Sequence, residues 1–205
     1  MTRNTWETYQ TTIGDRSSLF TALQAEWDVT NALYPGSYLD LSPSVAIQDV
    51  TYVDLDRRAE RFFADHELVE QQLHEAGVTG RSVDFIKADY GGDLPLAPGS
   101  FDLLISLYAG PFWDNCARYV KPGGLLLANN SHGDASIAAL DLRLSLISVV
   151  QATGSTFRLH MDSLDQYLIP KKPEHADADR IRSQGRGIAF TKPAFAYVFR
   201  LRDGL

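Results

Sequence analysis

Residues 50–56 read VTYVDLD, an apolar run that ends in two aspartates. A short run of this kind, rich in β-branched and aromatic residues, predicts a buried strand that stops where the acidic residues begin. Similar apolar runs recur along the chain, at 31–35 (NALYP), 83–88 (VDFIKA), 101–108 (FDLLISLY) and 125–130 (LLLANN). We therefore expect a sheet whose inner strands are covered on both faces.

Apolar residues at helical spacing separate these strands. The predicted helices cover 15–30, 41–47 (a brief helix or turn), 57–77, 111–120 and 134–151. Two more strands are predicted near the end of the chain, at 156–161 (TFRLHM) and 194–201 (AFAYVFRL). Strands that alternate with helices predict an α/β fold built on a parallel sheet.

Composition predicts one globular domain. The chain has 205 residues, of which 44% are apolar and 22% are charged, enough for a single hydrophobic core. Cys116 is the single cysteine, so an internal disulfide is excluded. No apolar stretch approaches the ~20 residues that span a bilayer. We therefore expect a cytoplasmic protein that has no membrane partner.

The charge is unevenly distributed. The net charge of −7 disfavours a nucleic-acid partner. Residues 1–150 hold 10 Lys/Arg against 20 Asp/Glu, a balance of −10, and residues 151–205 hold 9 against 6, a balance of +3. A mildly basic tail is either solvated surface or a source of cations for an acidic small-molecule substrate.

Polar residues follow several of the predicted strands. Ligands of parallel α/β sheets bind at the carboxyl ends of the strands, which selects the segments YPGS (34–37), VDLD (53–56), ADY (88–90), SLYAG (106–110) and NNSHGD (129–134). Asp54 is placed to accept hydrogen bonds from two vicinal ribose hydroxyls, whereas Asp56 is better placed to cap the next helix. The alternative is that both aspartates serve only the turn and the cap.

These segments together resemble the class I S-adenosylmethionine (AdoMet)-dependent methyltransferases. VDLD, DFIKADY, GSFDLLIS and VKPGGLLL occur in the order and spacing of that family over residues 31–130. The resemblance implies a Rossmann-like, seven-stranded, mostly parallel sheet with helices on both faces and an antiparallel last strand. It also implies a single domain, in which 1–30 form a helical cap, 31–151 the cofactor-binding core and 152–205 the C-terminal strands with a basic loop.

The resemblance assigns AdoMet as the cofactor and places its binding residues. It places Asp54 and Leu55 at the ribose of AdoMet, and Asp89 and Tyr90 at its adenine. Ser106, at the end of the fourth strand, is a further cofactor-binding residue. An aspartate in a loop can instead satisfy nearby backbone amides, which is the plainer interpretation of Asp89.

The loop after the first strand departs from the family. The family has several glycines there, whereas this chain has Tyr34, Pro35, Gly36 and Ser37. Gly36 is expected to make the tight turn, and Ser37 to offer a hydroxyl to the methionine end of AdoMet. A nicotinamide-dinucleotide site needs a Gly-x-Gly-x-x-Gly loop to bind its pyrophosphate. AdoMet has no phosphate, so it is the better match to a loop with few glycines.

Candidate catalytic residues follow the fourth and fifth strands. His132 is interpreted as a base or a substrate ligand that Asp134 orients; the alternative is that Asp134 caps a helix and His132 is exposed. Tyr108 is placed to contact substrate, or else to fill an interface between a strand and a helix. No spacing of Cys, His and Asp suggests a metal site. Arg16, near the start of the first long helix, is interpreted as solvated surface, with carboxylate binding as the alternative.

We therefore expect an AdoMet-dependent methyltransferase that acts on an unidentified small molecule. Two alternatives stay open: an AdoMet-binding enzyme of non-methyl chemistry (aminocarboxypropyl transfer or cyclisation), and a non-catalytic methyltransferase-like binding module. The sequence leaves the choice between monomer and homodimer open. The basic segment over 170–187 is expected to be a flexible loop that covers the mouth of the pocket.

Overall fold

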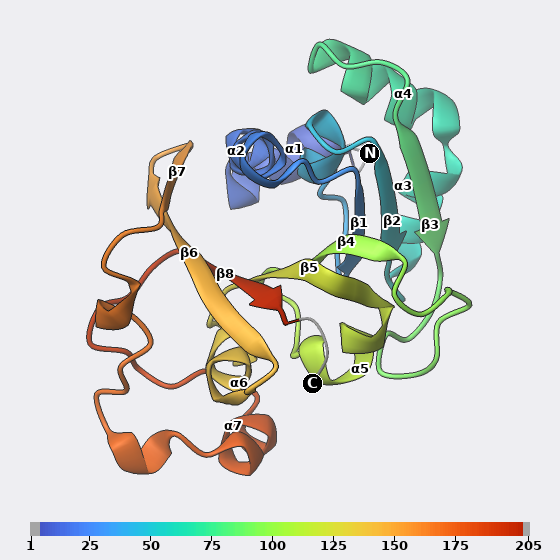
Figure 1. Cartoon of the computed structure of the whole chain (residues 1–205). Helices are drawn as coiled ribbons and strands as arrows, with labels where there is room; N and C mark the ends of the chain where they lie inside the picture. The colour runs from blue at the N-terminus through green and yellow to red at the C-terminus, as the bar shows by residue number, and fades with distance from the viewer. Residues whose placement is uncertain (1–4, 203–205) are drawn as a thin grey trace.

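One eight-stranded sheet organises the computed structural model, which describes residues 5–202. The strand order is β3-β2-β1-β4-β5-β8-β6-β7 (Figure 1). The strands are β1 (Asn31–Pro35), β2 (Asp49–Val53), β3 (Ser82–Ile86), β4 (Phe101–Ser106), β5 (Val120–Ala128), β6 (Leu144–Thr153), β7 (Thr156–His160) and β8 (Ala196–Leu201). Strands β1 to β5 run parallel, β8 runs antiparallel to both β5 and β6, and β7 runs antiparallel to β6.

Helices cover both faces of this sheet (Figure 1). The helices of one face are α1 (Trp6–Ile13), α2 (Ser17–Trp27), α3 (Arg57–Ala64) and α4 (His66–Glu75), and those of the other are α5 (Trp113–Cys116), α6 (Asp134–Leu140) and α7 (Ala178–Gln184). Successive side chains of a strand point to opposite faces. Leu103 and Ile105 of β4 therefore belong to the core beneath α2, and Leu104 to the core beneath α5.

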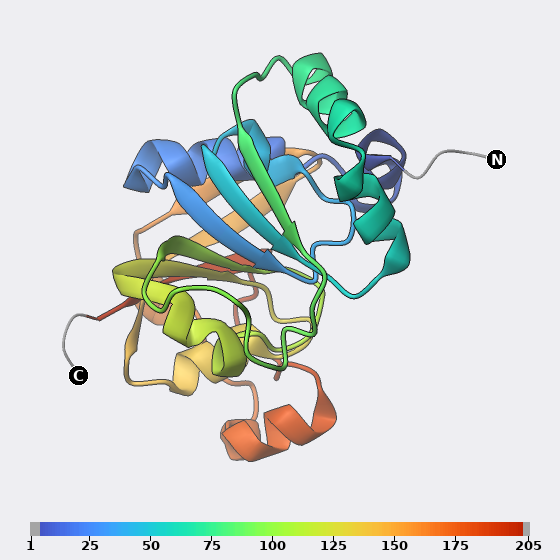
Figure 2. The ribbon, with the colours of Figure 1, turned by 90° about the vertical axis from the view of Figure 1, so that its right-hand side faces the viewer.

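The parallel half of the sheet sets the position of the site. Figure 2 shows β1, β2 and β3 side by side, and their parallel pairing brings their carboxyl ends to one edge. β4 pairs with the other side of β1 and ends at the same edge. The loops that follow these strands are therefore neighbours in space although they lie far apart in sequence.

The helix predicted over 134–151 is wrong in its second half. Helix α6 ends at Leu140, and residues 144–153 form strand β6. The segment LSLISVV contains three β-branched residues, which favour a strand, and β6 has a partner on each side, β8 and β7. The sheet thus has eight strands where seven were predicted; the mostly parallel arrangement and the antiparallel last strand are confirmed.

The two last predicted strands are present but do not pair with each other. β7 forms a hairpin with β6, and β8 lies between β5 and β6. No helix within residues 5–202 is long and apolar enough to cross a membrane.

Candidate cofactor site

Gly36 makes the turn after β1. Its φ is +64°, a left-handed conformation that glycine adopts without strain, and its N–H donates to the carbonyl of Val53 at 2.8 Å. A Cβ atom added here would lie 2.5 Å from Ala109 Cβ and 2.8 Å from Phe112 Cζ. The loop after β4 therefore packs directly on the turn after β1, and only glycine leaves room for it.

A cavity of about 370 Å³ opens beside this turn. We call it the edge cavity; its lining residues are Tyr9, Thr12, Ile13, Arg16, Tyr34, Gly36, Ser37, Leu107 and Tyr108. Four of these, Tyr34, Gly36, Ser37 and Tyr108, were predicted as site residues. Helix α1 contributes Tyr9, Thr12 and Ile13 to this lining, so it lies beside the turn after β1.

Arg16 is a buried residue of this cavity, and its interpretation as solvated surface is wrong. Only 5% of Arg16 is exposed. Its Nη1 donates to Asp40 Oδ2 at 3.1 Å, its guanidinium lies 5.0 Å from the ring centre of Tyr108, and its Nε has no hydrogen-bond partner in the described chain. Asp40 also accepts hydrogen bonds from the Tyr34 and Ser42 hydroxyls. The Asp40 carboxylate is therefore stabilised by other donors besides Arg16, and the Arg16 guanidinium has N–H groups left for another acceptor.

Ser37 carries a second donor of this kind. It is 2% exposed, and its hydroxyl has no hydrogen-bond partner in the described part of the chain. Buried polar atoms are almost always paired, because an unpaired one costs about 1–3 kcal/mol. Arg16 Nε and Ser37 Oγ are thus two unpaired donors on residues that line the edge cavity, and a ligand that accepts hydrogen bonds would reach them once the side chains around them move.

Asp54 lies at the end of β2 with its carboxylate held by backbone N–H groups. Oδ2 accepts from Tyr38 N at 2.9 Å, and Oδ1 accepts from Asp56 N at 2.8 Å. Each oxygen keeps a free lone pair. Asp56 caps α3, as predicted, by accepting from Arg58 N at 2.7 Å. The neighbouring Leu55 is 53% exposed, an apolar surface beside the acid.

Asp89 and Tyr90 follow β3 at the same edge. Asp89 is exposed and accepts from the N–H of Gly91 at 2.8 Å, the contact expected of a loop aspartate. The Tyr90 ring packs edge-on against Phe112 at 4.5 Å. Burial raises the pKa of Tyr90, and the nearby Asp54 carboxylate raises it further.

The predicted cofactor residues therefore form two groups at one edge. The edge cavity holds the loop after β1, while Asp54, Leu55, Asp89 and Tyr90 lie outside its lining. Pro35, the last residue of β1, is buried and positions the turn without lining the cavity.

Asp134 and Ser106 contact each other, and this contact replaces the predicted pairing of Asp134 with His132. Asp134 is 1% exposed. Its carboxylate accepts from the hydroxyl of Ser106 and, at 2.7 Å, from the N–H of Phe112. It neither caps α6, whose N-cap is Gly133, nor bonds to the exposed His132. Asp134 therefore anchors the loop after β4, and a catalytic role for His132, Tyr108 or Asp134 stays a prediction.

Burial makes the contribution of Asp134 to the free energy of unfolding depend on pH. It raises the pKa to about 6 from the ordinary 3.8, against the lowering effect of the hydrogen bonds from Ser106 and Phe112. The folded state therefore binds the proton more tightly than the unfolded state. Stability from this group is present below pH ~4 and is lost as the pH rises through about 6.

We expect Asp134→Asn to remove this contribution. Between pH 4 and pH 7 the free energy of unfolding of the native protein should fall by about 2 kcal/mol relative to that of the variant. Urea unfolding of both proteins at several pH values measures the difference. A difference that does not change with pH would show that Asp134 titrates normally.

The basic segment does not cover the edge cavity. It contains helix α7, and Arg182 pairs with Asp114 through two hydrogen bonds of 2.6 and 2.9 Å. Gly187 lies so close to Asn130 that an added Cβ would be 2.1 Å from Asn130 Oδ1. The segment is therefore packed against helix α5 and the loop that follows β5, and none of its residues lines the cavity.

Comparison with known proteins supports the fold. No protein-family model and no curated protein matches the sequence. A presumed O-methyltransferase from Klebsiella pneumoniae shares the structure with a TM-score of 0.52 at 12% identity, over 93% of this chain and 81% of its own. A methyltransferase from Geobacter sulfurreducens gives 0.50 at 16% identity, over 75% and 85%.

A third solved structure is similar over a smaller share of its own length. For a presumed AdoMet-dependent methyltransferase from Methanococcus maripaludis the TM-score is 0.44 at 13% identity, and this chain spans 59% of that protein's length. The first two structures show that this chain has the fold of the methyltransferases, so the resemblance seen in its sequence is confirmed as a resemblance of fold, in a divergent form.

Proposed function

We propose that this protein is an AdoMet-dependent methyltransferase acting on a small molecule in the cytoplasm. The observation that supports it most is the edge cavity with its two unpaired buried donors, at the place where strands β1 and β4 end. In parallel α/β proteins this edge is where ligands bind. Fold alone does not establish an activity, so the proposal rests on these side chains.

The donors and acceptors present at this edge fit the polar groups of AdoMet. Arg16 Nε and Ser37 Oγ would donate to the carboxylate of its methionine end, since both are donors without a partner. The fixed carboxylate of Asp54 would accept from the ribose hydroxyls. Asp89 and Tyr90 would meet the adenine, one loop further along the same edge.

AdoMet supplies a methyl group on a sulfonium centre, which transfers by in-line displacement. The contribution of this chain is positioning and exclusion of water. Helix α1 and Tyr108 wall the cavity. His132 is exposed and does not line it, so a substrate atom that needs no deprotonation is the better fit.

Asp54→Ala is expected to weaken AdoMet binding about 10- to 100-fold, because a hydrogen bond to a charged group contributes about 1.5–3 kcal/mol. Isothermal titration calorimetry measures the change. Asp56→Ala is the matched control: it removes the cap of α3 two residues away and should leave the affinity unchanged.

Two outcomes would contradict the proposal. If neither AdoMet nor S-adenosylhomocysteine at millimolar concentration raises the melting temperature of the native protein, the cofactor assignment is wrong. If a substrate is found and methylthioadenosine accumulates in place of S-adenosylhomocysteine, the protein uses AdoMet for a different transfer.

A further inference from the structure

Asn129 contacts the loops that follow strands β4 and β5. It comes directly after β5 and is 4% exposed. Its backbone N–H donates to the carbonyl of Ser106, the last residue of β4, at 3.0 Å. Its side-chain oxygen, Oδ1, accepts from the hydroxyl of Ser131 at 2.8 Å and from the N–H of Tyr108 at 3.4 Å. One buried side chain thus connects the two loops at this edge of the sheet.

Tyr108 has a backbone conformation that its surroundings must impose. Its φ of +62° lies in the left-handed region, where a residue with a bulky side chain is an outlier. Such a conformation persists only where neighbouring contacts fix the chain. On one side of Tyr108, Asn129 fixes the direction of its N–H; on the other side, Ala109 packs against the turn at Gly36. Within residues 5–202 the backbone of Tyr108 makes no other hydrogen bond.

The conformation of Tyr108 decides where its ring lies. Tyr108 lines the edge cavity, and the centre of its ring lies 5.0 Å from Arg16 Cζ and 6.1 Å from the ring centre of Phe195. The ring therefore covers the Arg16 guanidinium, while Tyr108 itself is 49% exposed. A charge that is shielded from water interacts more strongly with an opposite charge. The position of the ring thus affects how strongly Arg16 can bind an anion.

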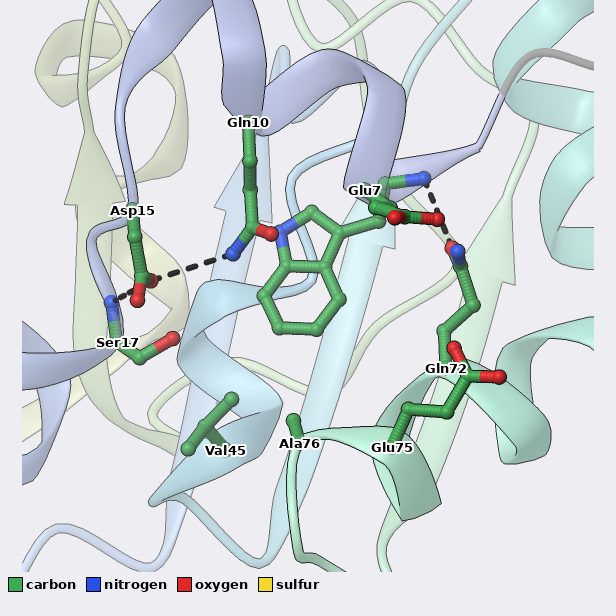
Figure 3. Close-up of a pocket in the computed structure, with 9 residues that line it drawn as sticks. Glu7, Gln10, Asp15, Ser17, Val45, Gln72, Glu75 and Ala76 are labelled. Atoms are coloured by element: carbon green, nitrogen blue, oxygen red, sulfur yellow. Dashed lines mark hydrogen bonds between the residues drawn. The ribbon is translucent and has the colours of Figure 1, made fainter.

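Arg16 itself is held in place independently of Tyr108. On the far side of helix α1, Asp15 Oδ1 accepts from the N–H of Ser17 at 2.8 Å and from the side-chain amide of Gln10 at 3.2 Å (Figure 3). The residues on both sides of Arg16 are therefore bonded to each other and to α1. The guanidinium pairs with Asp40 at 3.1 Å. Arg16 is thus fixed at its backbone and at its charged end, which leaves the ring of Tyr108 as the adjustable part of this wall.

We propose that Asn129 is a positioning residue of the edge cavity, which holds the backbone of Tyr108 so that the tyrosine ring covers Arg16. Asn129 is not among the residues that line the cavity, so it acts on a ligand through Tyr108 and Arg16. The consequence for AdoMet rests on the proposed function, because Arg16 is assigned there to the carboxylate of the methionine end. The hold on Tyr108 and its effect on Arg16 do not.

The direct test is the NMR signal of the Arg16 Nε–H group in the ¹⁵N-labelled native protein, without AdoMet. The signal that disappears in Arg16→Lys identifies it. Protons over the face of an aromatic ring are shielded, so Tyr108→Leu should move this signal downfield. Asn129→Leu, which keeps the size of the side chain but removes the acceptor, should move it in the same direction. An Arg16 signal that keeps its native position in Asn129→Leu would overturn the proposal.

Two control variants separate the contact with Tyr108 from the other contacts of Asn129. Asn129→Asp keeps an acceptor at the position of Oδ1 and should leave the Arg16 signal near its native position. Ser131→Ala removes the hydroxyl that also donates to Oδ1 and should leave the signal unmoved. Displacements of equal size in Ser131→Ala and Asn129→Leu would mean that Asn129 only orders the region as a whole, which contradicts a specific hold on Tyr108.

Hydrogen exchange of the native protein tests the contact without any variant. The N–H of Tyr108 should exchange more slowly than the N–H of Ala109, which donates to no group within residues 5–202. Equal exchange of the two amides would show that Asn129 does not hold Tyr108 in solution. This result would decide against the proposal even if Asn129→Leu failed to fold.

The effect on AdoMet is measured separately by calorimetry. Asn129→Leu should weaken binding about two- to thirtyfold, the range for substitutions that act through a neighbouring residue. In Tyr108→Leu, which has already lost the ring, adding Asn129→Leu should weaken binding no further. Further weakening there would show that Asn129 acts by another route, against the proposal. Failure of the native protein to bind AdoMet under any condition would count against the proposed function alone, since the Arg16 signal still decides the role of Asn129.

Discussion

Replacing Asp134 by alanine is expected to lower the free energy of unfolding by about 3 kcal/mol, because three buried donors lose their acceptor at once. The donors are the Ser106 hydroxyl and the backbone N–H groups of Phe112 and Trp113. Water reaches this place poorly, since Asp134 and Phe112 are fully buried. Urea unfolding at pH 7 measures the loss, and a loss below about 0.5 kcal/mol would show that the donors find other partners.

Ser106 supplies the matched control for this prediction. Ser106→Ala alone removes one donor and should cost about 1 kcal/mol. In the double variant the hydroxyl that Asp134→Ala leaves unpaired is gone as well, so adding Ser106→Ala to Asp134→Ala should cost nothing further. Costs that simply add would mean that the two side chains act independently, against the contact described here.

The fold was largely predictable because its strands are short, apolar and separated by helical segments. The runs at 50–56 and 101–108 each form strands close to their predicted positions. Residues 144–153 were not predicted as a strand, since apolar residues there satisfy a helical spacing as well as an alternating one. The choice is made by β7 and β8, which pair with this segment from both sides.

The site was predictable only where it is local in sequence. Asp54 and Gly36 occupy the positions expected of them, because a strand end and a tight turn are decided by neighbouring residues. The partner of Asp134, Ser106, lies 28 residues away at the end of β4, and that of Arg16 lies 24 residues away. Such contacts depend on which strands are neighbours, and one sequence does not specify that order residue by residue.

The loop after β4 carries much of what the sequence did not reveal. Asp134 holds its two ends, at Ser106 and Phe112, and Tyr108 within it has a φ of +62°, which is strained for a residue other than glycine. Ala109 lies against the turn at Gly36. Asp134 anchors this loop, and Ala109 packs it against the turn after β1. The loop therefore forms one wall of the edge cavity and limits the space available to a ligand.

Gly36→Ala tests that packing, and we expect it to lower the free energy of unfolding by about 3 kcal/mol. A left-handed conformation costs a residue with a Cβ about 1–2 kcal/mol, and forcing an extra methyl group into a packed interior costs about 1–3 kcal/mol more. The new Cβ would lie 2.5 Å from Ala109 Cβ and 2.8 Å from Phe112 Cζ, so the loop must move. Since the loop walls the edge cavity, affinity for AdoMet should fall in the same variant.

Gly154→Ala separates the two causes. Gly154, in the turn between β6 and β7, has a φ of +61°, close to that of Gly36, and nothing lies within 4 Å of its missing Cβ. It should cost about 1 kcal/mol from backbone strain alone, with AdoMet affinity unchanged. Equal losses in the two variants would mean that the loop after β4 yields freely at Ala109. Glycine would then be required in the turn after β1 only for its backbone conformation. The loop that forms the wall of the edge cavity would be easier to displace than its contacts indicate.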